Sequence, residues 1–145
     1  MLLLRFVMLS FCGLTLLSCG PQGPARKATY PVKGMVLVDG TPPGSPILIH
    51  CHPADGQVDA KMPTISQAIS DALGAFEIAT YEAGDGVPPG EYTLTFTWKH
   101  FSSMSMSYSG ADKLNDRYND PKKSPVTFTV SDQPIDLGTI ELTTK

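Results

Sequence analysis

The nine residues from Glu91 to Lys99 alternate strictly between polar and apolar side chains. The apolar set shares one face of an extended strand: Tyr92, Leu94, Phe96 and Trp98. Because successive side chains of a strand point to opposite sides, this period of two predicts an antiparallel sheet with one buried face and one wetted face. No helical period of useful length appears in this run.

Six shorter runs with the same period surround this strand, and turn-forming residues separate them. Glycine and proline, 13 of each among 145 residues, make up about 18% of the chain against a usual level of about 12%, which favours short strands over long helices. The chain is therefore predicted to be all-β, a seven-stranded antiparallel β-sandwich in one domain. The other six strands are expected at residues 32–38, 47–52, 65–70, 75–81, 126–130 and 135–142.

Two local irregularities follow from the pattern. Residues 71–74 end in glycine, and they predict a hairpin turn in which Gly74 takes a positive φ. In the last strand the inward set is Ile135, Leu137, Ile140 and Leu142, so its parity changes around Gly138. This change predicts a β-bulge there.

One long interruption, residues 101–123, separates the fifth and sixth expected strands, and loops of this length are often functional. Within it a short helix is expected from Asp112 to Tyr118. Asp112 can cap its N-terminus, and Leu114 and Tyr118 fall on one face. That face is predicted to dock on the sheet.

The N-terminus has the pattern of an export signal. Arg5 precedes an apolar run from Phe6 to Leu17, which is about a dozen residues long and shorter than the roughly 20 that span a bilayer. Residues 16–19, Leu-Leu-Ser-Cys, follow at once and resemble the lipobox of bacterial lipoproteins. The resemblance implies cleavage after residue 18 and lipidation of Cys19.

The predicted organisation has three parts: a lipoprotein signal peptide (1–18), a lipidated tether (19–29) and a β-sandwich domain (30–145). The tether has no periodicity and reaches at most about 35 Å. The expected location is the cell envelope, with the chain anchored to a bacterial membrane, the outer membrane favoured, and the domain in the periplasm or at the cell surface.

Residues 30–143 also resemble a carboxypeptidase regulatory-like domain, which has a transthyretin-like (prealbumin-like) sandwich. The matching segments are Val-Lys-Gly-Met-Val at 32–36, Asp-Gly at 39–40, and Val-Pro-Pro-Gly-Glu-Tyr-Thr-Leu at 87–94. The resemblance implies a non-catalytic module with a structural or interaction role, and it supplies no catalytic residue. Transthyretin-like hydrolases end in Tyr-Arg-Gly-Ser, whereas this chain ends Glu-Leu-Thr-Thr-Lys, so a hydrolase is the less favoured alternative.

Several side chains suit a ligand, and each set also has a packing or surface explanation. An envelope copper or zinc protein is the main alternative function, with candidate ligands His50, His52, His100, Met104 and Met106. Oxygen ligands for calcium occur at Asp112, Asn115, Asp116, Asn119 and Asp120, without the EF-hand spacing. Trp98 could stack on a sugar or on an apolar ligand.

The expected partners are a membrane, reached through the lipid anchor, and an unknown envelope protein or ligand. The formal net charge of −3 provides no basic field for nucleic acid. The sequence contains no phosphate-cradling glycine loop and no catalytic Gly-x-Ser-x-Gly elbow. No cofactor and no enzyme activity are predicted.

Overall fold

The computed structural model describes residues 26–56 and 64–145. The predicted signal peptide, the predicted lipidation site Cys19 and the first part of the predicted tether lie outside these residues. The described part contains nine strands and no helix. The strands are β1 (Val32–Val38), β2 (Leu48–Pro53), β3 (Ser66–Ile69), β4 (Ala75–Glu77), β5 (Gly90–Thr97), β6 (His100–Ser102), β7 (Ser107–Ser109), β8 (Thr127–Val130) and β9 (Ile135–Leu142).

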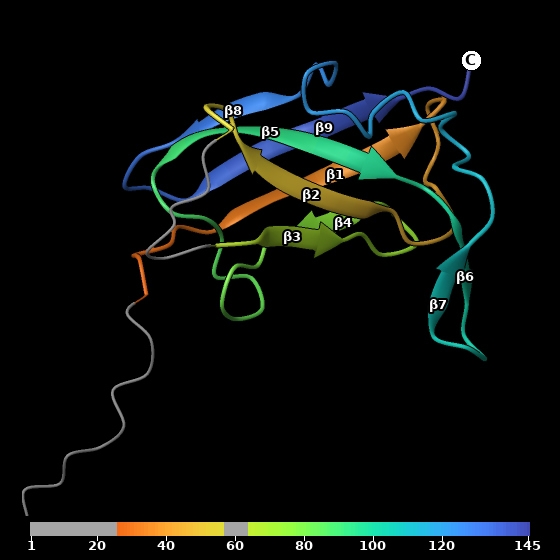
Figure 1. The fold of residues 1–145 in the computed structure, drawn as a ribbon, viewed down its shortest axis with the longest axis horizontal. Coiled ribbons are helices and arrows are strands. Elements are labelled where there is room, and N and C mark those ends of the chain that lie inside the picture. The colour runs from red at the N-terminus through yellow and green to blue at the C-terminus, as the bar shows by residue number, and fades with distance from the viewer. Residues whose placement is uncertain (1–25, 57–63) are drawn as a thin grey trace, which may run out of the picture.

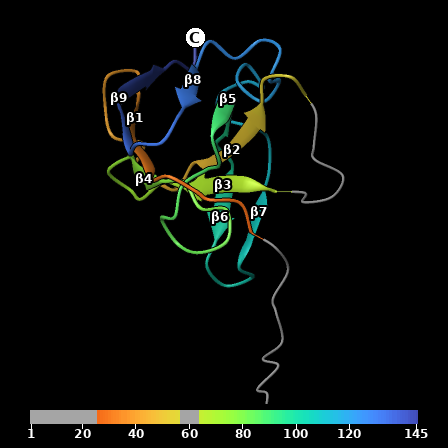
Figure 2. The same ribbon diagram turned by 90° about the vertical axis from the view of Figure 1, so that its left-hand side faces the viewer.

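Seven of the nine strands form two sheets that pack face to face. One sheet has the order β4-β1-β9 and the other the order β3-β2-β5-β8 (Figures 1 and 2). Strands β6 and β7 form a separate two-stranded hairpin, which projects away from the sandwich in Figure 1. The all-β prediction is confirmed, and the predicted count of seven strands is wrong.

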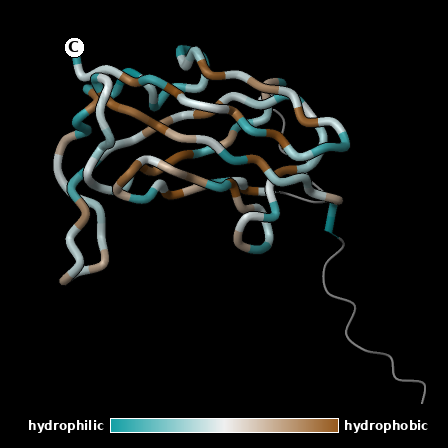
Figure 3. The backbone as a smooth tube through the Cα atoms, turned by 180° about the vertical axis from the view of Figure 1, so that it is seen from behind, coloured by the Kyte–Doolittle hydropathy of each residue, from teal (hydrophilic) through white to brown (hydrophobic). Residues whose placement is uncertain are grey.

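The core lies between the two sheets, where the alternating patterns place it. Val36, Ile49, Leu94 and Phe96 have no solvent exposure, and they come from both sheets. Figure 3 shows the apolar segments concentrated in the strands that cross the domain. Burial of each large apolar side chain contributes about 1.5–3 kcal/mol, so these strands hold the two layers together.

The last strand runs parallel to the first, which corrects the antiparallel prediction. In the β1–β9 ladder Val36 lies opposite Ile140 and Val38 opposite Leu142, in parallel register. The chain crosses from the edge of one sheet to the edge of the other between β8 and β9, so no hairpin dictates the direction of β9. Alternation of side chains shows which face is buried and does not encode strand direction.

The predicted bulge at Gly138 is confirmed. Lys33 pairs with Asp136 and Met35 with Thr139, so β9 has one extra residue at this point. Gly138 has a φ of 64°, which is a conformation that glycine adopts without steric cost. The extra residue explains why the inward set of β9 changes parity.

The turn at residues 71–74 is confirmed, whereas the hairpin that it was expected to join is not. Gly74 has a φ of 95°, and a Cβ there would lie 1.9 Å from the carbonyl oxygen of Val36. The turn connects β3 of one sheet to β4 of the other, so the two strands separate instead of forming a continuous ladder.

The long interruption contains the β6–β7 hairpin in place of the predicted helix. Phe101 and Tyr108 pair across the hairpin, with ring centroids 5.1 Å apart. Farther along, Asn115 and Asp116 both have a φ of 56°, and two consecutive left-handed residues cannot continue a right-handed helix. The short helix is therefore absent.

The expected docking of the predicted helical segment does occur, through turns. Leu114 is fully buried, and the ring of Tyr118 packs edge-on against Phe96, with centroids 6.4 Å apart. Asp112 organises the turns, because its carboxylate accepts hydrogen bonds from the backbone N–H groups of Trp98 (2.8 Å) and Leu114 (3.1 Å).

Candidate functional site

A groove opens where β3 and β4 separate. Two sets of backbone hydrogen bonds close its ends: Gln67 and Ala79 exchange a pair, of 2.9 and 3.0 Å, and Asp71 donates to Ala75 at 2.9 Å. Ile69 and Glu77 lie between these points. Within the part of the chain that the structure covers, no hydrogen bond joins Ile69 to Glu77. The ladder therefore lacks its middle pair.

The backbone groups of Ile69 in β3 point toward β4, and those of Glu77 in β4 point toward β3. Ser70 bonds to Ile47 on the β2 side, and since ladder bonds alternate along a strand, the N–H and C=O of Ile69 face away from β2. The same argument applies to Glu77, because Ile78 bonds to Val32 on the β1 side. Each residue thus presents a backbone donor and acceptor to the groove, and neither residue has a backbone partner there among residues 26–56 and 64–145.

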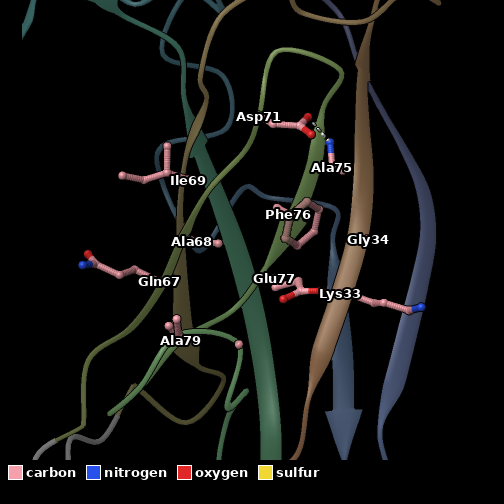
Figure 4. Close-up of a pocket in the computed structure, with 12 residues that line it drawn as sticks. Lys33, Gly34, Gln67, Ala68, Ile69, Asp71, Ala75, Phe76, Glu77 and Ala79 are labelled. Carbon is pink, nitrogen blue, oxygen red and sulfur yellow. Dashed lines mark hydrogen bonds between the residues drawn. The ribbon is translucent and has the colours of Figure 1, made fainter. Parts of the chain in front are cut away.

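The groove has a volume of about 650 Å³, and Figure 4 shows the residues that line it. Phe76 forms an apolar part of the lining, and small side chains surround it, including Ala68, Ala75, Ala79 and Ala83. Ile69, which is 54% exposed, also lines the groove, and its side chain points away from Phe76 in Figure 4. The arrangement can accept a short extended segment through backbone hydrogen bonds and small apolar contacts.

Two charged groups at the rim, those of Lys33 and Asp71, have local partners. Lys33 Nζ lies 3.6 Å from an Asp136 oxygen. The Asp71 carboxylate accepts hydrogen bonds from the N–H groups of Leu73 (2.9 Å) and Ala75 (2.8 Å). These bonds stabilise the turn at one end of the groove. The Glu77 carboxylate also lines the groove, together with the backbone groups (Figure 4).

His50 and His52 lie together on the outer face of the β3-β2-β5-β8 sheet. Their ring centroids are 6.3 Å apart, and Nε2 of His52 is 2.9 Å from the Thr95 hydroxyl oxygen. Burial, and to a smaller extent the nearby His50, lower the pKa of His52, which favours the neutral form of its ring. Cys51 lies between the two histidines in the sequence, and its side chain points into the core. Burial there raises its thiol pKa to about 12.

The other candidate metal ligands lie on the β6–β7 hairpin. His100 begins β6, and Met104 and Met106 occupy the turn, where they are 97% and 77% exposed. In residues 26–56 and 64–145 there is no group of three or more His, Cys, Asp or Glu side chains placed to hold a metal ion. The five candidate ligands are thus divided between β2 and the hairpin.

The candidate calcium ligands form a local hydrogen-bond network. Asp116 Oδ1 accepts from the Asn119 side chain at 2.8 Å, and Asn115 donates to the carbonyl of Thr144 at 2.8 Å. Asp120 accepts from the backbone of Lys122. Each contact fastens the 112–124 segment to itself or to the C-terminal residues.

Trp98 is half-buried and held from two sides. Its indole N–H donates to the Ser45 hydroxyl at 2.8 Å, and Lys113 Nζ lies 4.4 Å from the ring centroid. The ring also packs against the core, so its position is set by contacts within the domain.

Arg26 and Lys27, which belong to the predicted tether, contact the domain. The guanidinium of Arg26 lies 2.7 Å from the Glu82 carboxylate and sits over the ring of Tyr81 at 5.3 Å. The N–H of Lys27 donates to the Tyr81 hydroxyl at 3.1 Å. No helix able to cross a membrane occurs in the described ranges.

Sequence reasoning missed the groove. It depends on the separation of β3 from β4, and each strand has an ordinary alternating pattern. The short run between the strands, Ser-Asp-Ala-Leu-Gly, is equally compatible with a hairpin in one sheet. Only the pairing of β4 with β1 reveals the opening.

No protein-family model matches the chain, and no curated protein matches its sequence. Among solved structures it is similar to BcpA, the major pilin subunit of Bacillus cereus, with 14% identity and a TM-score of 0.49 over 81% of this chain and 31% of the pilin. It is also similar to a 9R-lipoxygenase from Cyanothece, with 16% identity and a TM-score of 0.39 over 79% of this chain and 16% of the enzyme. The chain thus spans less than a third of either protein.

Proposed function

We propose that this chain is a lipid-anchored, non-catalytic module of a bacterial cell envelope that binds a short extended segment of a partner protein. The observation that carries the binding role is the groove between β3 and β4, with its unpaired backbone groups at Ile69 and Glu77. The lipobox at residues 16–19 supports the anchor. The two-sheet architecture is compatible with the transthyretin-like module that the sequence resembles.

The anchor would hold the domain close to the bilayer. Arg26 already contacts Glu82 and Tyr81, so at most residues 20–25 lie between Cys19 and a described contact with the domain. A chain of this length reaches at most about 25 Å. The partner is therefore expected in or near the same membrane.

Replacement of the predicted lipidated residue tests the anchor. Cys19→Ser is expected to abolish incorporation of labelled palmitate and to move the protein from the detergent phase to the aqueous phase. The physical reason is that each buried methylene contributes about 0.8 kcal/mol, so two or three acyl chains hold a protein on a membrane. Cys12→Ser is the matched control, because bulky Phe11 precedes that cysteine. Equal labelling of the Cys19→Ser variant and the parent would refute the anchor.

A catalytic role for Cys51 is disfavoured by its position. The thiol faces the core, and its pKa of about 12 keeps it protonated at neutral pH, whereas the thiolate is the nucleophilic form. Tyr92 is also unsuited to proton transfer at neutral pH, because burial raises its pKa to about 12 and its hydroxyl donates to the carbonyl of Pro88 at 2.8 Å. Both side chains pack in the hydrophobic core.

Site-specific photo-crosslinking tests the binding role of the groove. A photoreactive amino acid at Ile69, beside the unpaired backbone groups, is expected to give one discrete protein adduct in intact cells. Thr127 is the matched control position, because it is exposed on β8 at the opposite edge of the same sheet. Ala83→Trp, which adds bulk to the exposed side of the groove, is expected to remove the adduct. Identical adducts from Ile69 and Thr127, or none from Ile69, would contradict the proposal.

A further inference from the structure

We propose that His50 and His52 form a two-imidazole binding site for one divalent copper ion on the outer face of β2. The site differs from the five-residue set expected from the sequence, because it contains neither His100 nor the two methionines. It is also independent of the groove, since the groove-lining residues include neither histidine.

Strand geometry brings the two rings together. His50 and His52 are separated by one residue in β2, so their side chains leave the same face of the sheet. A metal ion bound to a ring nitrogen at about 2.0–2.1 Å lies about 3.2 Å from the ring centre, so two rings on one ion have centres up to about 6.4 Å apart. The observed separation of 6.3 Å falls within this limit.

Neighbouring strands flank His50 and fix the ring of His52. In the register, His50 lies between Gln67 of β3 and Thr95 of β5. Thr95 is 3% exposed, and its hydroxyl oxygen lies 2.9 Å from Nε2 of His52. When Nε2–H donates to this hydroxyl, the lone pair of Nδ1 is left for an ion. An outer-shell partner of this kind commonly fixes the tautomer of a metal-binding histidine.

The chemistry of the donors favours copper. Two neutral imidazoles are ligands for borderline divalent ions, and at a given nitrogen site the affinity is highest for Cu²⁺ among the first-row divalent metals. The thiol of Cys51 points to the opposite face of the strand, so the site lacks the soft ligand that would select Cu⁺. Water would complete the coordination, since within the described residues no His, Cys, Asp or Glu side chain joins the pair in a group of three.

Copper titration of the purified full chain in detergent tests the site. One equivalent of Cu²⁺ is expected, with an electron paramagnetic resonance spectrum that shows coupling to two imidazole nitrogens. Loss of an outer-shell partner alone costs about 10- to 100-fold in metal affinity. His50→Gln and His52→Gln, which each remove a ligand, should therefore weaken binding by at least about 10-fold, and Thr95→Val by about 10-fold.

His100→Gln is the matched control, because it removes an exposed histidine that lies outside the pair. Its affinity and spectrum are expected to equal those of the parent. Three results would overturn the proposal: no stoichiometric copper binding by the parent, unchanged binding by a variant that lacks both His50 and His52, or an equal loss in His100→Gln. A circular dichroism spectrum of each variant checks that the sheet is intact.

Discussion

Phe96→Ala is expected to lower the free energy of unfolding by about 3 to 5 kcal/mol. Phe96 has no solvent exposure and lies in β5, between β2 and β8 in its sheet. Its ring packs edge-on against Tyr118, so truncation creates a cavity and also removes one of the contacts that dock the 112–118 segment. Small domains have a total stability of about 5–15 kcal/mol, and the loss is therefore a large part of the whole.

Chemical denaturation of the purified variant measures this effect. Phe101→Ala is the matched control, because Phe101 is only half-buried and belongs to the projecting β6–β7 hairpin. Its loss is expected to be below about 1 kcal/mol, since truncation outside the core leaves no closed cavity. Equal midpoints for Phe96→Ala and the parent would mean that β5 presents its other face to the core.

Gly86→Ala is expected to destabilise the domain by about 3 kcal/mol or more, through strain and a steric clash together. Gly86 has a φ of 82°, and a Cβ there would lie 1.7 Å from the carbonyl oxygen of Tyr30. The same region carries the paired bonds between Tyr30 and Val87, of 2.9 and 3.1 Å. Relief of the clash must therefore displace the chain where it enters β1.

Gly40→Ala separates the two causes. Gly40 has a similar φ of 77° but no atom within 4 Å of an added Cβ, so it reports the cost of the left-handed conformation alone, about 1–2 kcal/mol. Thermal unfolding of the two variants gives the comparison. If Gly86→Ala proves as mild as Gly40→Ala, the close approach of Gly86 to Tyr30 is not present in solution.

Much of the fold could be predicted because burial leaves a period in the sequence. The burial of Tyr92, Leu94 and Phe96 in β5, the bulge at Gly138 and the positive φ of Gly74 all follow from local rules of alternation and turn chemistry. The burial of Thr93 and Thr95 on the other face of β5, which was predicted to be wetted, does not. The choice of which strands pair with each other leaves no such period in the sequence. The parallel pairing of β9 with β1 and the passage of the chain from β3 to a different sheet at β4 depend on which edges meet in three dimensions.

The predicted helix failed for a related reason. The spacing of Leu114 and Tyr118 correctly places both side chains toward the core, because turns can bring residues four apart to one side as a helix does. Asn115 and Asp116 decide between the two structures, since asparagine and aspartate adopt the left-handed conformation more readily than most residues. The candidate sites divide in the same way: His50 and His52 were visible as neighbours, whereas the groove required knowledge of the tertiary pairing.

The parallel alignment of β1 and β9 also determines how the domain responds to mechanical load. The chain enters β1 at one end of the ladder and leaves β9 at the other (Figure 1). Tension applied between the two termini pulls these neighbours lengthwise in opposite directions, so their ladder bonds resist rupture together. If the first and last strands were antiparallel, the same tension would act at one end of their ladder and break its hydrogen bonds one at a time. With the N-terminal anchor proposed above, a pull on the C-terminus would load this ladder in shear.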